Sequence, residues 1–286
     1  MAIVNINVSV TNPPKPSQLL KSGAIISMGG TTLAAGEYQL LTTKDDLKAI
    51  TSPAKTISTI AWATGVVTVT LSVAHGWTVG DTIPLVVSSV TPSAYNRAVT
   101  ATVTTSTAFT YPLATDPGTA TVMGTVKTVA ANEIIEMNTT FWAQGTTRAV
   151  YVLELGDVSV SAAVASLSDF IDEDISLGNT YQKFFSYLVP REWDGEPTFK
   201  TLTGLYTSPA SLVYFFITTT TATYPDWVAT KNKSVCAGVE SPNIPAGEFS
   251  MAFPFQSSLA NDPGSSNMVP PMAYLSLIHI SEPTRH

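Results

Sequence analysis

The sequence predicts a protein of mixed α/β and α+β class, with a three-layer α/β domain into which a small all-β domain, a sandwich or a barrel, is inserted. Residues 53–128 are rich in Thr, Val, Ala and Ser, carry little charge and show short strand patterns between Gly, Pro and Asn. Residues 129–274 instead alternate strand and helix patterns. Because helix patterns flank the charge-poor region, we expect residues 21–52 and 129–274 to form one domain that hosts the insertion.

The composition fits a folded protein and excludes several classes of partner. Of the 286 residues 44% are hydrophobic and only 12% are charged, about half the usual charged fraction. The net charge of −7 lacks the basic surplus that phosphate binding requires, so we expect no nucleic acid partner. No stretch approaches the ~20 apolar residues of a membrane span, and no signal peptide pattern is present. We therefore expect no membrane partner and synthesis in the cytosol.

The first 20 residues predict an arm that reaches away from the domain. From Val4 onward apolar residues alternate with Asn and Ser, as in a strand with one covered face. Asn12–Pro16 then forms a stiff linker, because proline fixes φ and donates no hydrogen bond. An ordinary edge strand of the domain's own sheet is the alternative. The candidate strand that pairs between subunits consists of Ile3, Val4, Ile6, Val8 and Val10.

The residues after the arm predict two short strands and a helix, at 23–28, 37–41 and 43–50. Thr43 is the expected N-cap of the helix, and acidic residues occupy its first turn.

The inserted domain has four clear strand patterns, at 66–71, 82–87, 99–103 and 108–111. The stretch Ala74-His75-Gly76-Trp77-Thr78-Val79-Gly80-Asp81, followed by Pro92-Ser93-Ala94-Tyr95-Asn96, resembles a β module that recurs in phage structural proteins. Three aromatic residues of this domain form either a platform for stacking a sugar or, as is more common, part of a small core. They are Trp62, Trp77 and Tyr95.

Helix and strand patterns resume after the insertion. Residues 130–144 place Ile134, Met137, Phe141 and Trp142 on one helical face, with Gly145 at the C′ position. The next segments with regular patterns are a buried strand at 148–155, a helix at 161–171, strands at 181–189, 211–218 and 234–239, and helices at 196–205 and 224–230.

The run Phe141-Trp142-Ala143-Gln144-Gly145-Thr146-Thr147-Arg148-Ala149-Val150-Tyr151-Val152-Leu153 resembles the tail sheath proteins of contractile-tailed bacteriophages. In that family an aromatic-ended helix, a glycine turn and a core strand follow one another. The order of parts over residues 1–52 and 129–274 is also similar: a strand on a linker, a short Asp-containing helix, and a surface β domain before the helix.

The resemblance implies a structural subunit that polymerises around a tail tube and shortens when the baseplate triggers it, which drives genome delivery. The implied partners are further copies of the chain in a helical homo-oligomer, the tail tube protein, and the baseplate and tail terminator proteins. The implied location is the tail of the virion, after assembly in the host cytoplasm. Terminal segments of such subunits complete sheets in their neighbours, a form of β-augmentation. The resemblance also implies a contraction that needs no cofactor or nucleotide.

The chain lacks the sequence motifs of common enzymes. P-loop, dinucleotide-binding, nucleophile-elbow and zinc-protease patterns are all missing from the sequence. The acidic group Asp169, Asp172, Glu173 and Asp174 lacks calcium-loop spacing, and the closely spaced Glu192, Asp194 and Glu196 carry no evidence of a glycosidase pair. Cys236 is expected to be buried and structural. We therefore predict no enzyme activity and no catalytic, cofactor-binding or metal-binding residues.

Two alternatives to a sheath subunit stay open. One is another tail component, such as a baseplate or fibre protein, and the other is a carbohydrate-binding or adhesion protein built around residues 53–128. Residues 275–286 resemble a translated sequencing adapter, so we expect the natural chain to continue differently after Tyr274.

Overall fold

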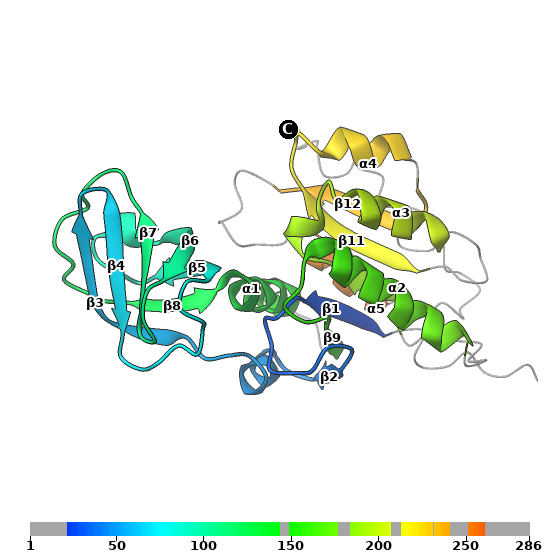
Figure 1. The fold of residues 1–286 in the computed structure, drawn as a ribbon. Helices are drawn as coiled ribbons and strands as arrows, with labels where there is room; N and C mark the ends of the chain where they lie inside the picture. Colours follow the sequence, from blue (N-terminus) through cyan, green and yellow to red (C-terminus); the bar gives the residue numbers. More distant parts are fainter. Residues whose placement is uncertain are drawn as a thin grey trace, which may run out of the picture.

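The computed structural model describes residues 22–143, 149–176, 184–206, 213–230, 232–240 and 251–260. The chain is of mixed α/β class, as predicted, and combines a sheet with helices and a closed six-stranded β-barrel (Figure 1). The barrel stands to one side of the sheet and its helices, with helix α1 (Val129–Ala143) between them (Figure 1).

The sheet has six strands in the order β12-β11-β10-β1-β9-β2. Five of them run parallel, and β2 pairs antiparallel with β9 at one edge. Strands β1, β10 and β11 are buried along their whole length, which explains why their sequences are mostly apolar, with Ser or Thr as the polar residues. The bounds are β1 Gly23–Ser27, β2 Tyr38–Leu41, β9 Val150–Glu154, β10 Ser186–Leu188, β11 Tyr214–Thr219 and β12 Val235–Val239.

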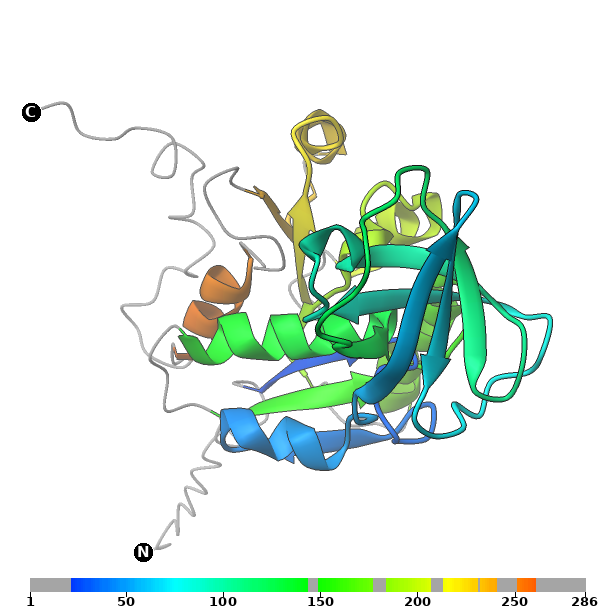
Figure 2. The same ribbon diagram turned by 90° about the vertical axis from the view of Figure 1, so that its left-hand side faces the viewer.

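Helices pack on both faces of the sheet (Figures 1 and 2). One hydrophobic core contains residues of α2 (Val160–Ser176), α3 (Pro197–Leu205) and α4 (Tyr224–Thr230). The other contains residues of α1, α5 (Ala252–Ala260) and the short 3-10 helix η2 (Lys44–Ala49). Two further 3-10 turns are η3 (Ser93–Tyr95) and η4 (Arg191–Trp193).

The inserted region is a barrel and not a sandwich. Its strands follow the order β3-β4-β7-β6-β5-β8, and β8 pairs back onto β3 to close it. A separate hydrophobic core fills the barrel and includes Phe109 and Tyr111. Closure leaves no strand edge exposed to other chains. The bounds are β3 Lys55–Ala63, β4 Val66–Leu71, β5 Thr82–Ser88, β6 Arg97–Val103, β7 Ala108–Pro112 and β8 Thr125–Thr128.

The barrel and the sheet meet at the start of α1. Strand β8 ends at Thr128 and α1 begins at the next residue, so the last barrel strand runs directly into the helix. The Thr128 hydroxyl accepts a hydrogen bond from the Ala131 N–H at 3.2 Å, as an N-cap does. On the sheet side, a Cβ on Gly30 would lie 2.6 Å from the Ala130 carbonyl oxygen. The turn after β1 therefore approaches α1 as closely as only glycine allows.

Most predicted elements are confirmed, and the differences have physical causes. Strands β3 and β8 were not predicted, because the pairing between them that closes the barrel joins segments far apart in the sequence. Helix α5 was not predicted either. The helix expected at 43–50 is a 3-10 helix, whose Asp46 carboxylate accepts from the N–H groups of Thr42 and Thr43. These two bonds and the two threonine hydroxyls hold the pKa of Asp46 well below its usual range.

Candidate functional site at the carboxyl edge of the sheet

The five parallel strands of the sheet end at one edge, where open α/β sheets usually bind their ligands. The loops that leave this edge follow β1, β9, β10, β11 and β12. Acidic and threonine side chains are concentrated there, and α1 passes beside them. Ligand-binding or catalytic groups are therefore expected at this edge.

Glu154, the last residue of β9, is a buried carboxylate that binds the turn after β1. Its side chain is 1% exposed. One oxygen accepts from the N–H groups of Gly29 at 2.6 Å and Gly156 at 2.7 Å. The other accepts from the hydroxyls of Ser27 and Thr31, both at 2.7 Å, and from the Thr31 N–H at 3.1 Å. Five donors from its own chain therefore occupy the acceptor positions of this carboxylate.

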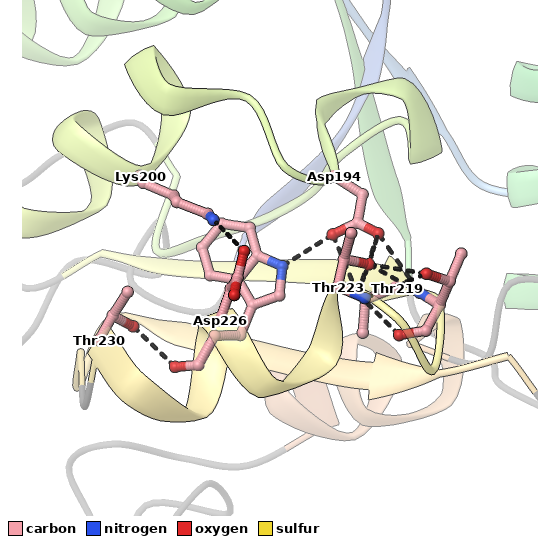
Figure 3. Close-up of polar contacts among 8 residues, drawn as sticks. Asp194, Lys200, Thr219, Thr223, Asp226 and Thr230 are labelled. Carbon is pink, nitrogen blue, oxygen red and sulfur yellow. Dashed lines mark hydrogen bonds and ion pairs between the residues drawn. The ribbon is translucent and has the colours of Figure 1, made fainter.

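Asp194, just after η4, is a second carboxylate whose acceptor positions are filled (Figure 3). One oxygen accepts from the Trp227 indole N–H at 2.8 Å, and the Thr219 hydroxyl lies 2.9 Å from both oxygens. The other oxygen also accepts from the Thr223 hydroxyl and from the Thr220 N–H. Asp194 thereby ties η4 to the end of β11 and to α4.

The outer side of this cluster is closed by an ion pair (Figure 3). Lys200 of α3 lies 3.1 Å from the Asp226 carboxylate and 5.5 Å from the centre of the Trp227 ring. The Thr230 hydroxyl donates to the Trp227 carbonyl at 2.7 Å, near the end of α4. These contacts join α3 to α4.

A third acidic group lies where α1 crosses the edge. Glu133 accepts from the Arg191 N–H at 2.8 Å, and the Arg191 guanidinium lies 3.1 Å from Glu240. Burial raises the pKa of Glu133 to about 7, helped by the nearby charges of Glu192 and Glu136. Burial also raises the pKa values of Glu136 and Glu192. This group links α1 to the ends of β10 and β12.

Three observations describe the metal-binding and nucleophilic groups of the described residues. Within the described residues, no cluster of three or more His, Cys, Asp or Glu side chains has the geometry to hold a metal ion. Burial raises the pKa of Cys236 to about 12, which removes the thiolate that a nucleophile needs. His75 lies in the barrel, and both its ring nitrogens are engaged by backbone groups. The carboxylates of this edge position loops of their own chain.

The two tryptophans among the three predicted aromatic residues of the barrel lie far apart, and Tyr95 is buried. Tyr95 is 1% exposed and donates its hydroxyl to the Gly118 carbonyl at 2.9 Å. Trp62 is half-buried and donates to the Leu113 carbonyl at 2.7 Å. Trp77 is also half-buried and lies beside Lys55 at the start of β3, whereas Trp62 is seven residues further, about 23 Å along the strand. All three pack against the barrel core.

Some residues named in the sequence analysis lie outside the part of the chain that the structure describes, and the role of two carboxylates of the site was not predicted. The arm residues Ile3, Val4, Ile6, Val8 and Val10 lie outside the described residues, as do Gly145 and residues 275–286. Glu154 and Asp194 each act as a clamp, that is, a carboxylate that binds several donors from neighbouring loops. This role was not predicted from the sequence. Their signal in the sequence is an acidic residue at or just beyond the end of a buried strand, close to Ser, Thr and Gly turns.

Comparison with protein-family models, with curated proteins and with solved structures gave no match to this chain. Among the helices within the described ranges, none combines the length and apolar character needed to cross a bilayer.

Proposed function

We propose that this chain is a tail sheath subunit of a contractile-tailed bacteriophage, which polymerises around the tail tube and shortens to drive genome delivery. One observation carries the proposal. A closed barrel is inserted between a short Asp-containing helix and the aromatic-ended helix α1 of an α/β region. This is the order of parts for which the sequence resembles sheath proteins, and helices on both faces of the sheet suit the three-layer core expected of them.

The state of the carboxyl edge supports a structural role over an enzymatic one. Glu154 and Asp194 are held by five and four donors, so both are committed to their own loops. A subunit that transmits force benefits from an edge stiffened in this way, because each clamp ties a loop to two elements of the sheet.

The arm supplies the proposed contact between subunits. Strands β2 and β12 are the outermost of the six-stranded sheet in the described part of the chain. A strand formed by residues 3–10 of one copy would add to a sheet of its neighbour by β-augmentation, and the proline linker would span the gap. Contraction would then slide the bodies while the added strands keep the rings joined. The tube, baseplate and terminator proteins are the further partners, and the virion tail is the proposed location.

Negative-stain electron microscopy of the purified protein tests the proposal. Hollow helical tubes are the expected result. Small closed oligomers would favour a baseplate or fibre protein, and a monomer at all concentrations would contradict any assembly role. Glycan binding by a monomer would favour the adhesion alternative.

A pair of arm variants sharpens the test. Ile6→Asn combined with Val8→Asn removes the apolar face of the arm and is expected to abolish tubes without changing the circular dichroism spectrum. Asn5→Thr combined with Asn7→Thr changes the opposite face and serves as the control, which should still assemble. Equal assembly by both variants would contradict strand exchange through this arm.

A further inference from the structure

A small pocket of about 120 Å³ lies at the junction between the barrel and α1. Its walls come from three places: the segment that leads into the barrel, the barrel itself, and the first turn of the helix. The lining residues are Ser52, Pro53, Lys55, His75, Trp77, Val126, Lys127, Thr128 and Ala131. Its volume corresponds to about four water molecules in the liquid, enough for a group of a few heavy atoms and too small for a nucleotide.

The charge of the pocket is opposite to that of the chain. Lys55 and Lys127 are its two charged residues. No carboxylate is among the residues that line it, although Glu136 of α1, outside the lining, lies near enough to Lys127 for the two charges to attract. Both lysines are half-buried. The pocket is thus positively charged in a protein whose net charge is −7. A half-buried ammonium group loses hydration unless it finds a partner. The Lys55 ammonium lies 5.8 Å from the centre of the Trp77 ring, a weak contact compared with an anion.

One wall of the pocket is formed by His75 and Trp77, whose rings contact each other. His75 is 5% exposed, and its ring stacks on Trp77 with 4.6 Å between ring centres. The His75 Nε2 lies 2.8 Å from the Thr105 carbonyl, and Nδ1 accepts from the Trp77 N–H at 3.0 Å. These two bonds fix the tautomer with the proton on Nε2. The fixed His75 ring gives the Trp77 indole a flat surface to stack on.

We infer that this pocket binds a small oxyanion, a carboxylate or a phosphate group, between Lys55 and Lys127. Lys55 comes from β3, Lys127 from β8 and Ala131 from α1, so a bound anion would contact both the barrel and the helix. The site would thus brace the junction between the two regions. The anion is either a free ion or an acidic side chain of a second copy.

The test is a titration of the full chain with acetate and with inorganic phosphate at constant ionic strength, followed by the NMR signal of the Trp77 indole N–H. Saturable binding is expected, with a loss of at least tenfold in affinity in Lys55→Met and in Lys127→Met. Lys48→Met is the matched control, because Lys48 is exposed and paired with Asp45, and it should bind as the parent does. No saturable shift with either anion, or equal affinity in all variants, would overturn the inference.

Two further measurements complete the test. Phosphate should protect Lys55 and Lys127 of the unmodified protein from chemical acetylation, read by mass spectrometry, while Lys48 reacts as before. This protection measurement uses the unmodified protein, so it is valid even where a lysine variant fails to fold. Equal reactivity with and without phosphate would count against the site. Sedimentation distinguishes the sources: dissociation of oligomers by acetate or phosphate indicates an acidic side chain of a second copy, and unchanged sedimentation with saturable binding indicates a free ion.

Discussion

The barrel and the α/β region reach stability by different routes. The barrel uses one continuous segment, 55–128, whose strands all pair antiparallel around an apolar core. The α/β region combines two distant segments, and its central strand β1 pairs with β9 and β10, more than 120 residues later. It also buries Glu154, whereas the buried residues of the barrel include no carboxylate. Both regions therefore share apolar packing, and the α/β region adds a buried carboxylate that binds its loops together.

The largest expected effect is the loss of barrel stability when a large side chain is removed from the barrel core. Phe109 is fully buried in the barrel core, so Phe109→Ala should lower the stability of the barrel by about 4 kcal/mol. Hydrogen exchange read by mass spectrometry should show the loss in barrel peptides and little change in peptides from β1, β10 and β11. Val79→Ala, at a valine that is 58% exposed, is the control. Equal loss in both regions would mean that they unfold as one unit.

The second effect is the loss of stability in the α/β region when the Glu154 carboxylate is removed. Glu154→Ala leaves five donors without their shared acceptor and should cost about 3 kcal/mol in the α/β region. Denaturant unfolding combined with the same exchange measurement checks this. Glu37→Ala removes an exposed glutamate of the same loop and should change stability little. A small effect of Glu154→Ala would show that packing dominates here too.

The third effect is a pH dependence confined to the α/β region. The folded pKa of Glu133 is about 7, above the ordinary 4.5, so the folded state binds the extra proton between these values. Stability should therefore fall as pH rises from 4.5 to 7, by at most about 1.4 kcal/mol per pH unit for this group.

Glu133→Gln should flatten this slope in thermal unfolding measured across that pH range, and Glu37→Gln, at an exposed site, should leave it unchanged. A slope that persists in Glu133→Gln would assign the dependence to its raised neighbours, Glu136 and Glu192.

The smallest effect concerns one bond of the second clamp. Thr223→Val removes a hydroxyl that donates to Asp194 while the other donors stay, so a loss of about 1 kcal/mol is expected. Thr221→Val, two residues away at an exposed position, is the matched control in the same unfolding experiment. Identical stability of both variants would show that the remaining donors suffice.

Strands and helices with strong hydrophobic periodicity could be predicted from the sequence. Contacts between segments far apart in the chain, including the polar ones, could not. The β4 prediction matched Val66–Leu71 because its alternation reflects one buried face. β3 and β8 were missed because closing a barrel depends on pairing between segments about 70 residues apart. Asp194 was weighed only as a catalytic residue, since nothing in its local sequence reveals that Thr219, Thr223 and Trp227 converge on it.

The closing pair of the barrel has a consequence for how the protein can change. Lys55 lies opposite Val126, so the chain leaves the α/β region and returns to it at neighbouring points. A domain whose two ends lie side by side can be replaced without moving the elements that flank it. Exchanging it for another compact domain, or for a short loop, would alter the outer surface while the connection between η2 and α1 stays the same length. Diversity at this surface can therefore arise by replacement of whole domains, without altered contacts in the sheet.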